Sequence, residues 1–187
     1  IRLFVTTFLV NCAIVVPYAA KSVLLIDAGF SIADSALYGI VAGNAVGAAA
    51  AFSARPMLEY FGPLRSLAAL GTTNALAMSA VVLFGNGVLA SVTTVALILF
   101  SNASVFAAFT VSRAAIMRLC APGREATELT IFVGLETVLY LILAGLGLGF
   151  LDTLGFAVIS LAGIVMTLAG VAITLWTIAS QRHLTDR

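Results

Sequence analysis

The sequence predicts an all-α polytopic membrane protein, in which residues 1–187 form a single bundle of six transmembrane helices. One observation behind this prediction is the stretch 66–112, which has no charged residue and is interrupted only by Gly85-Asn86-Gly87. Each arm is long enough to cross a bilayer, because a spanning helix needs about 20 predominantly apolar residues. The other is composition: 62% of the residues are hydrophobic and 9% are charged, whereas soluble domains carry about 25% charged residues.

Charges and turn residues bound each apolar run. The first run ends after Lys21, and a charged segment, 55–65, separates the second run from the third. A basic segment, 118–124, separates the fourth from the fifth, and Asp152 precedes the sixth. Since the connections are short, we expect antiparallel, close-packed neighbours. The predicted spans are residues 3–25, 35–54, 64–84, 88–117, 128–150 and 154–180.

The basic residues predict the orientation. With six spans, one side of the membrane receives Arg2, Arg55, Arg65, Arg113, Arg118, Arg124, Arg182 and Arg187. The other side receives Lys21, Asp27, Asp34 and Asp152. Because Lys and Arg concentrate in cytoplasmic loops, we expect both termini in the cytoplasm, and a bacterial inner membrane as the location.

Polar side chains form a stripe on the first span. Thr7, Asn11, Tyr18 and Lys21 fall within one sector of a helix, and Pro17 frees a backbone carbonyl among them. The fourth span repeats the pattern, with Asn102, Phe106, Phe109 and Arg113. Each asparagine alone could simply bond to a neighbouring helix. Two matching stripes favour a shared cavity.

Glu136 lies about two turns inside the fifth span, where ionisable side chains are rare and usually functional. Arg113 lies at a similar depth on the preceding helix. Two interpretations stay open. The residues form a buried pair that only ties two helices together, or Glu136 exchanges a proton and Arg113 holds an anionic substrate. The predicted substrate pathway comprises Asn11, Tyr18, Lys21, Asn102, Arg113, Glu136 and Tyr140.

Small residues follow the second span at every fourth position, from Ser35 through Gly43 and Gly47 to Ala51. Such a ridge lets another helix approach closely. It is either a packing face or a sliding surface between two bundles.

Enzyme chemistry finds little support in the chain. The sequence has no H-E-x-x-H, no G-x-S-x-G and no Walker-type glycine loop, and its only histidine is His183. No Cys or His cluster offers a metal site, and the net charge of +1 gives no nucleic-acid footprint. We therefore expect no enzymatic activity, no metal, no cofactor and no nucleic-acid partner.

Residues 55–65, which read RPMLEYFGPLR, resemble the signature loop of the major facilitator superfamily, roughly G-x-L-a-D-r-x-G-r-r. Glu59 matches the Asp position, Gly62 the second Gly, and Arg65 lies near the basic cluster. Arg55 replaces the first Gly, and Pro63-Leu64 occupy basic positions. The segments LIDAGFS (25–31) and APGREAT (121–127) are similar to the flanking family segments.

The resemblance implies one six-helix half of a twelve-helix transporter, built as two inverted three-helix repeats. The degenerate loop and the short tail favour the C-terminal half. A second six-helix bundle, in the same polypeptide or another chain, would complete the site, and Arg55, Glu59, Gly62 and Arg65 would form a gating loop.

The leading functional hypothesis is half of a secondary active transporter that moves a small solute by alternating access. Lys21 and Arg113 are positively charged and Glu136 is negatively charged, so the predicted pathway is mildly positive. This favours a small organic anion as the substrate. The alternative is a non-transporting membrane scaffold or accessory subunit with the same fold, which the degenerate loop favours.

Overall fold

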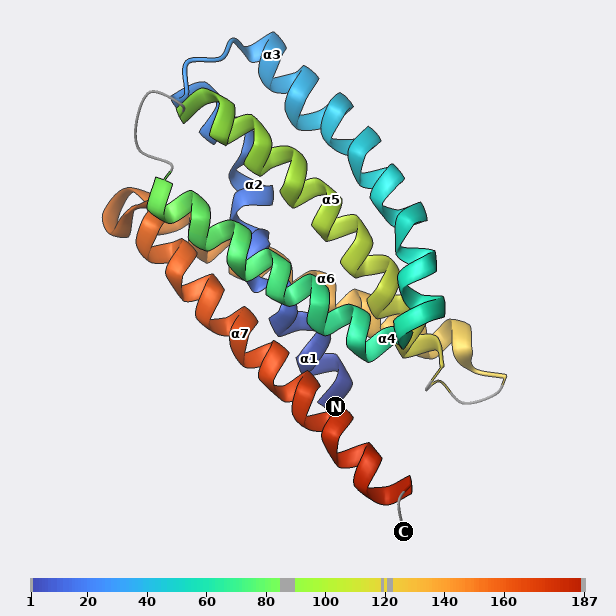
Figure 1. Ribbon diagram of the computed structural model, residues 1–187. Helices are drawn as coiled ribbons and strands as arrows, with labels where there is room; N and C mark the ends of the chain where they lie inside the picture. Colours follow the sequence, from blue (N-terminus) through green and yellow to red (C-terminus); the bar gives the residue numbers. More distant parts are fainter. Residues whose placement is uncertain (1, 85–89, 119, 121–122, 186–187) are drawn as a thin grey trace.

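The computed structural model describes residues 2–84, 90–118, 120 and 123–185, and the regular elements of this part are all helical (Figure 1). This confirms the all-α prediction. The Gly85-Asn86-Gly87 turn, the start of the fourth predicted span at 88, and residues 121–122 lie outside the described residues. The elements are α1 (Arg2–Val10), α2 (Cys12–Asp27), α3 (Ile32–Ala36), the π-helix η1 (Leu37–Ala42), α4 (Gly43–Phe84), α5 (Ala90–Met117), α6 (Glu125–Gly149) and α7 (Leu151–Thr185).

Four helices of the described chain are long and apolar enough to cross a membrane. They are Ile32–Ala80, Ser91–Met117, Glu125–Gly149 and Leu151–Ser180. The structure therefore supports a multi-pass integral membrane protein. The first predicted span, 3–25, is divided between α1 and α2, and α2, the longer of them, has only 16 residues.

Helix α4 reverses direction at Gly62, as Figure 1 shows. Gly62 has φ 73° and ψ 167°, a left-handed conformation that glycine adopts without steric cost. The Ser66 hydroxyl lies within hydrogen-bonding distance of the carbonyls of Gly62 (2.8 Å) and Met57 (2.9 Å), one on each side of the turn. The expectation of a loop over 55–65 is therefore wrong. Helix continues from the first leg (43–61) to the second leg (63–84) with one non-helical residue between them.

The start of α1 and the end of α7 lie toward one end of the bundle in Figure 1. The Gly62 reversal and the connection between α5 and α6 lie at this end too, whereas the connections from α2 to α3 and from α6 to α7 lie at the opposite end. The Gly62 reversal, the end of α5 and the start of α6 therefore share an end of the bundle with the start of α1 and the end of α7.

The small-residue ridge of the second span packs against α5. A Cβ atom at Gly43 would lie 2.8 Å from the Asn102 amide nitrogen, and one at Gly47 would lie 2.7 Å from the Phe106 ring. These contacts agree with the packing interpretation of the ridge.

The first predicted span is broken at Asn11, where α1 ends and α2 begins. The Thr167 hydroxyl of α7 lies at the break, where it accepts a hydrogen bond from the Ala13 N–H (2.9 Å) and donates one to the Leu9 carbonyl (3.2 Å). In an uninterrupted α-helix the Ala13 N–H would bond to the Leu9 carbonyl directly. The inserted hydroxyl replaces that bond, and such insertion is a known cause of helix kinks.

Two glycines of α7 allow the broken segment to come this close. A Cβ atom at Gly163 would lie 3.0 Å from the Cys12 carbonyl oxygen, and one at Gly170 would lie 2.8 Å from the Val10 backbone nitrogen. Gly163, Thr167 and Gly170 are four and three residues apart, so they share one face of α7. This face fixes the position of the break.

Replacing Thr167 with Val keeps the side-chain shape but removes the hydroxyl. We expect the free energy of unfolding to fall by about 1–3 kcal/mol, because the Ala13 N–H and the Leu9 carbonyl lose their partner. Thr174→Val is the matched control, since Thr174 is equally buried in α7 but donates to the Gly170 carbonyl of its own helix (2.8 Å). Denaturant unfolding in detergent micelles measures the difference. Equal losses in the two variants would contradict the bridging role.

Candidate functional site

Tyr140 of α6 is the centre of a buried polar cluster that joins α6 to the break in the first helix. Its hydroxyl lies 3.3 Å from Glu136 Oε1, one turn earlier, and accepts a hydrogen bond from the Asn11 amide nitrogen (3.2 Å). Its ring stacks on Phe8 of α1, with ring centroids 5.1 Å apart. Glu136 is 2% exposed and Asn11 1% exposed. Three of the predicted pathway residues therefore meet in the interior of the bundle.

The helix break supplies this cluster with backbone acceptors. The Asn11 N–H bonds to the Phe8 carbonyl, three residues back (3.2 Å). The Thr7 carbonyl accepts instead from the Asn11 side-chain amide (3.0 Å), and the Tyr140 hydroxyl lies 3.3 Å from the same oxygen. Side chains thus satisfy backbone groups in a region where a bilayer provides no water.

The Tyr140 hydroxyl lies near more hydrogen-bond acceptors than its one hydrogen can serve, and the Thr7 side chain is a further hydrogen-bond partner of Glu136. The Tyr140 hydroxyl has one hydrogen, but Glu136 Oε1 and the carbonyls of Thr7 and Phe8 all lie 3.3–3.4 Å away. Asn11 Oδ1 is buried without a hydrogen-bond partner. A proton on the Glu136 carboxyl would add a further donor to the cluster. The arrangement is therefore chemically suited to take up and release a proton.

Arg113 of α5 lies close enough to Glu136 for an attractive Coulombic interaction, as their similar depths predict. The two side chains do not form an ion pair within 4.0 Å. The ion pairs given for the described part of the chain are Arg55–Glu59 at 2.8 Å, within α4, and Arg124–Glu128 at 3.6 Å, at the start of α6. The Arg113 guanidinium lies 4.9 Å from the Phe109 ring centroid, and its Nε is buried without a hydrogen-bond partner. Arg113 therefore retains an unused donor beside the cluster.

A groove of about 360 Å³ lies beside the cluster, between α2, α5 and α6. Most of its lining surface is apolar, and we call it the polar groove only because Asn11, Tyr18, Thr137 and Tyr140 are among its lining residues. Its apolar lining residues are Val15, Ala19, Val105, Phe109, Leu141 and Ala144. The volume is within the range of small-molecule sites, about 300–1,000 Å³.

Two predicted pathway residues lie elsewhere. Asn102 does not line the polar groove. It is fully buried against Gly43, and its amide donates to the Ile98 carbonyl of its own helix (2.8 Å). Lys21 is half-buried near the other end of α2, with its Nζ 4.4 Å from the Tyr18 ring centroid. Asn102 is thus a packing residue in this structure, and Lys21 reaches the groove only through Tyr18.

The predicted gating residues lie on the exposed surface around the Gly62 reversal. Arg55 and Glu59 pair with each other, and their side chains are 83% and 59% exposed. An exposed pair one helical turn apart contributes little to stability, because solvent screens it. Arg65, on the second leg, is exposed as well.

Thr167 and Thr137 are site residues that the sequence interpretation missed. Thr167 had one available signal, its place between Gly163 and Gly170 on a small-residue face. No feature of the sequence marked Thr137, because its contribution to the groove depends on how α6 is rotated against α2 and α5.

Comparisons with known protein families, with curated proteins and with solved structures find no match to the chain. The likeness of residues 55–65 to the major facilitator loop therefore remains a hypothesis. The functional argument rests on the fold and on the geometry of the cluster.

The Tyr140 hydroxyl can be removed without its ring. We expect Tyr140→Phe to lower the free energy of unfolding by about 0.6–2 kcal/mol, because the Asn11 amide loses an acceptor and Glu136 loses a donor. Tyr18→Phe is the control, since Tyr18 lines the same groove but is only half-buried. Combining Tyr140→Phe with Glu136→Gln should cost less than the sum of the two single changes. Strictly additive losses would argue against a cluster.

Proposed function

We propose that the chain is one six-helix half of a secondary active transporter that moves a small solute by alternating access. The observation that carries the proposal is the buried cluster of Glu136, Tyr140 and Asn11 beside an open groove. Ionisable side chains inside a membrane bundle are costly and mark ion or substrate pathways. Secondary transporters often bind substrates and ions at discontinuous helices, and the break at Asn11 is such a feature.

The proposed topology has six crossings. The two legs of α4 count as separate crossings, and α1 with α2 counts as one. The end of the bundle that holds the start of α1, the end of α7 and the Gly62 reversal is cytoplasmic in this proposal, following the distribution of basic residues, and the membrane is a bacterial inner membrane.

The major facilitator resemblance extends the proposal to two inverted three-helix repeats and a second six-helix bundle. The polar groove lies between the first, fourth and fifth crossings. In that family arrangement the first and fourth crossings line the central cavity and the fifth lies at the interface between halves. The groove would therefore open toward the second bundle, and the chain would serve as the C-terminal half.

Protons are the proposed coupling ion. Glu136 is the buried carboxyl of the acceptor-rich cluster, and Arg113 attracts its charged form. When Glu136 takes a proton, that attraction is lost, and Arg113 is free to bind the carboxylate of a small organic anion. Proton uptake and substrate binding would then favour each other.

A transport assay tests this proposal. Proteoliposomes with the full polypeptide are given radiolabelled small mono- and dicarboxylates under pH gradients of either sign. We expect gradient-driven accumulation by the wild type. Glu136→Gln should lose accumulation but keep solute-for-solute exchange, because the variant can bind substrate without a titratable carboxyl. Glu128→Gln, at the start of the same helix, is the control. Unchanged accumulation by Glu136→Gln would remove the coupling role.

Thiol labelling tests whether water enters the polar groove. Thr137→Cys, exposed on the groove wall, should react with a membrane-impermeant maleimide in a background without Cys12 and Cys120. Asn102→Cys should stay unreactive, because that position is 0% exposed against Gly43. An unreactive Thr137→Cys from both sides of the membrane would mean that lipid or protein fills the groove.

A non-transporting scaffold is the second candidate, favoured by Arg55 and Pro63-Leu64 in place of the family's glycine and basic residues. The wild type would then show neither accumulation nor exchange of any test solute, although the cluster variants would still lose stability. That combination of results separates a scaffold from an uncoupled transporter.

A further inference from the structure

The polar groove has one aromatic ring on each of its three walls. Tyr18 comes from α2, Phe109 from α5 and Tyr140 from α6. Tyr18 and Phe109 are half-buried side chains on the groove surface, and both pack against the same part of the core. The ring centroids of Phe109 and Tyr140 lie 5.9 Å apart, with an interplanar angle of 41°. A solute in this groove would therefore meet aromatic rings from three helices.

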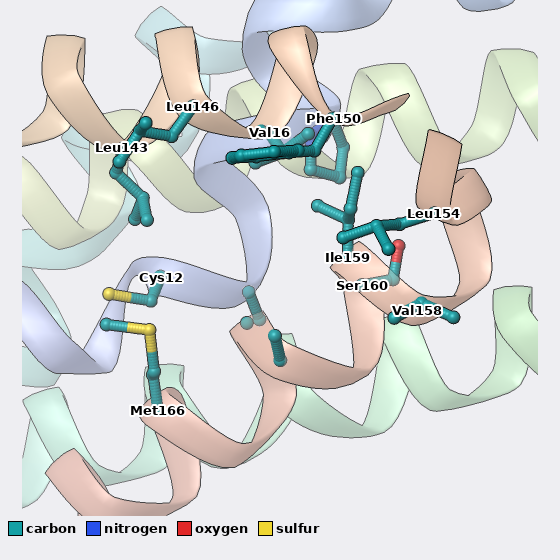
Figure 2. Close-up of a pocket in the computed structure, with 15 residues that line it drawn as sticks. Cys12, Val16, Leu143, Leu146, Phe150, Leu154, Val158, Ile159, Ser160 and Met166 are labelled. Carbon is teal, nitrogen blue, oxygen red and sulfur yellow. The ribbon is translucent and has the colours of Figure 1, made fainter. Parts of the chain in front are cut away.

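A second groove shows that this grouping of rings is not a general feature of the apolar surface. It lies between α2, α6 and α7 and has a volume of about 280 Å³ (Figure 2). Figure 2 shows aliphatic and sulfur-containing side chains along its walls, among them Leu143, Val158 and Met166. Phe150 is the one aromatic residue among those that line it. The rings are thus concentrated at the groove that borders the Glu136 cluster.

Two of the three rings carry a cation. The Lys21 ammonium lies 4.4 Å from the Tyr18 ring centroid, and the Arg113 guanidinium lies 4.9 Å from that of Phe109. Lys21 follows Tyr18 toward the α2–α3 connection, whereas Arg113 follows Phe109 toward the α5–α6 connection at the opposite end of the bundle. Lys21 has no acidic partner within 4.0 Å in the described part of the chain. Glu136 balances only one of the two positive charges.

These charges decide between two classes of aromatic-binding ligand. A cage of aromatic rings alone favours an organic cation such as a quaternary ammonium. Here Lys21 and Arg113 already lie on two of the rings, so a further cation would be repelled. The electrostatics of the groove therefore favour an anion.

The lining offers few hydrogen bonds to a solute. Asn11 and Tyr140 are only 1% and 9% exposed and bond within the buried cluster. The Thr137 hydroxyl donates to the Val133 carbonyl of its own helix (2.7 Å). Tyr18 is the remaining polar residue of the lining. A polar group that leaves water without a new partner costs free energy, so a sugar or a dicarboxylate fits this lining poorly. A solute with one terminal charge and an apolar body fits it well.

We propose that the polar groove selects an aromatic monocarboxylate, and that Tyr18 and Phe109 are the specificity-determining residues that contact its ring. This inference rests on the proposed function, in which Arg113 binds the carboxylate. Aromatic pairs attract each other beyond the effect of the area that they bury. An aliphatic body of the same size lacks that attraction, so the groove discriminates against it.

Equilibrium binding to the full polypeptide, purified in mild detergent, tests this selectivity. The two main probes are phenylpropionate and cyclohexylpropionate, which share the carboxylate and the number of carbons and differ in the aromaticity of the ring. Phenyltrimethylammonium is the cationic probe. We expect the wild type to bind phenylpropionate about two- to tenfold more tightly than cyclohexylpropionate, the contribution of one aromatic pair.

Leucine at the ring positions removes the aromatic surface but keeps an apolar wall. Tyr18→Leu and Phe109→Leu should each reduce the preference for phenylpropionate toward parity, whereas Tyr18→Phe should keep it. Phe106→Leu is the matched control, because Phe106 lies on the same helix as Phe109 but packs against Gly47 and does not line the groove. Each variant is judged by the ratio of its two dissociation constants, which a general loss of stability leaves unchanged. Thermal unfolding confirms that the variants are folded.

Four results would overturn the selectivity. They are a preference retained in both leucine variants at the groove, an equal loss in Phe106→Leu, tighter binding of cyclohexylpropionate or phenyltrimethylammonium by the wild type, and no binding of any probe. The transport assay gives a separate answer. Selective binding without accumulation or exchange would contradict the transporter but support the aromatic site. Accumulation of carboxylates without a preference for the aromatic ring would do the reverse.

Discussion

The Thr167 hydroxyl keeps the first helix broken at Asn11, and the candidate site depends on this break. With the hydroxyl between the Ala13 N–H and the Leu9 carbonyl, α1 and α2 cannot join as one continuous helix. The Asn11 N–H bonds to the Phe8 carbonyl instead of the Thr7 carbonyl, and the Thr7 carbonyl accepts a hydrogen bond from the Asn11 side chain. A local disturbance supplied by α7 therefore creates the acceptors that Tyr140 reaches from α6.

The same cluster is also the main attachment of α6. The buried residues of this helix are Glu136, Tyr140 and Gly147, four and seven residues apart on one narrow stripe. Gly147 contacts Val16, where an added Cβ would come within 2.5 Å. The remainder of α6 is largely exposed and apolar, as expected for a helix that faces lipid or another bundle. A change in the charge of Glu136 would therefore act on the contacts that hold α6 in place.

Much of this architecture was predictable from composition and periodicity. The absence of charges gave the helical class, and the polar stripe on the first span located Asn11 and Tyr18 on the polar groove. The break at Asn11 was not predictable from local sequence, because Thr167, far along the chain, causes it. The same limit applies to Asn102, whose contact with Gly43 depends on how α4 and α5 pack. Residues 55–65 were misread as a loop, because Gly62 alone makes the reversal and both flanks stay helical.

The break at Asn11 also has a consequence for biosynthesis. The segment of α1 and α2 leaves the ribosome long before α7 has been made. Until then no Thr167 hydroxyl is available, and backbone groups in lipid must bond within their own segment. The nascent first helix must therefore insert unbroken, with Ala13 bonded directly to Leu9. Only when α7 docks can that bond be exchanged for the bridge, so the candidate site is completed only after α7 has been made.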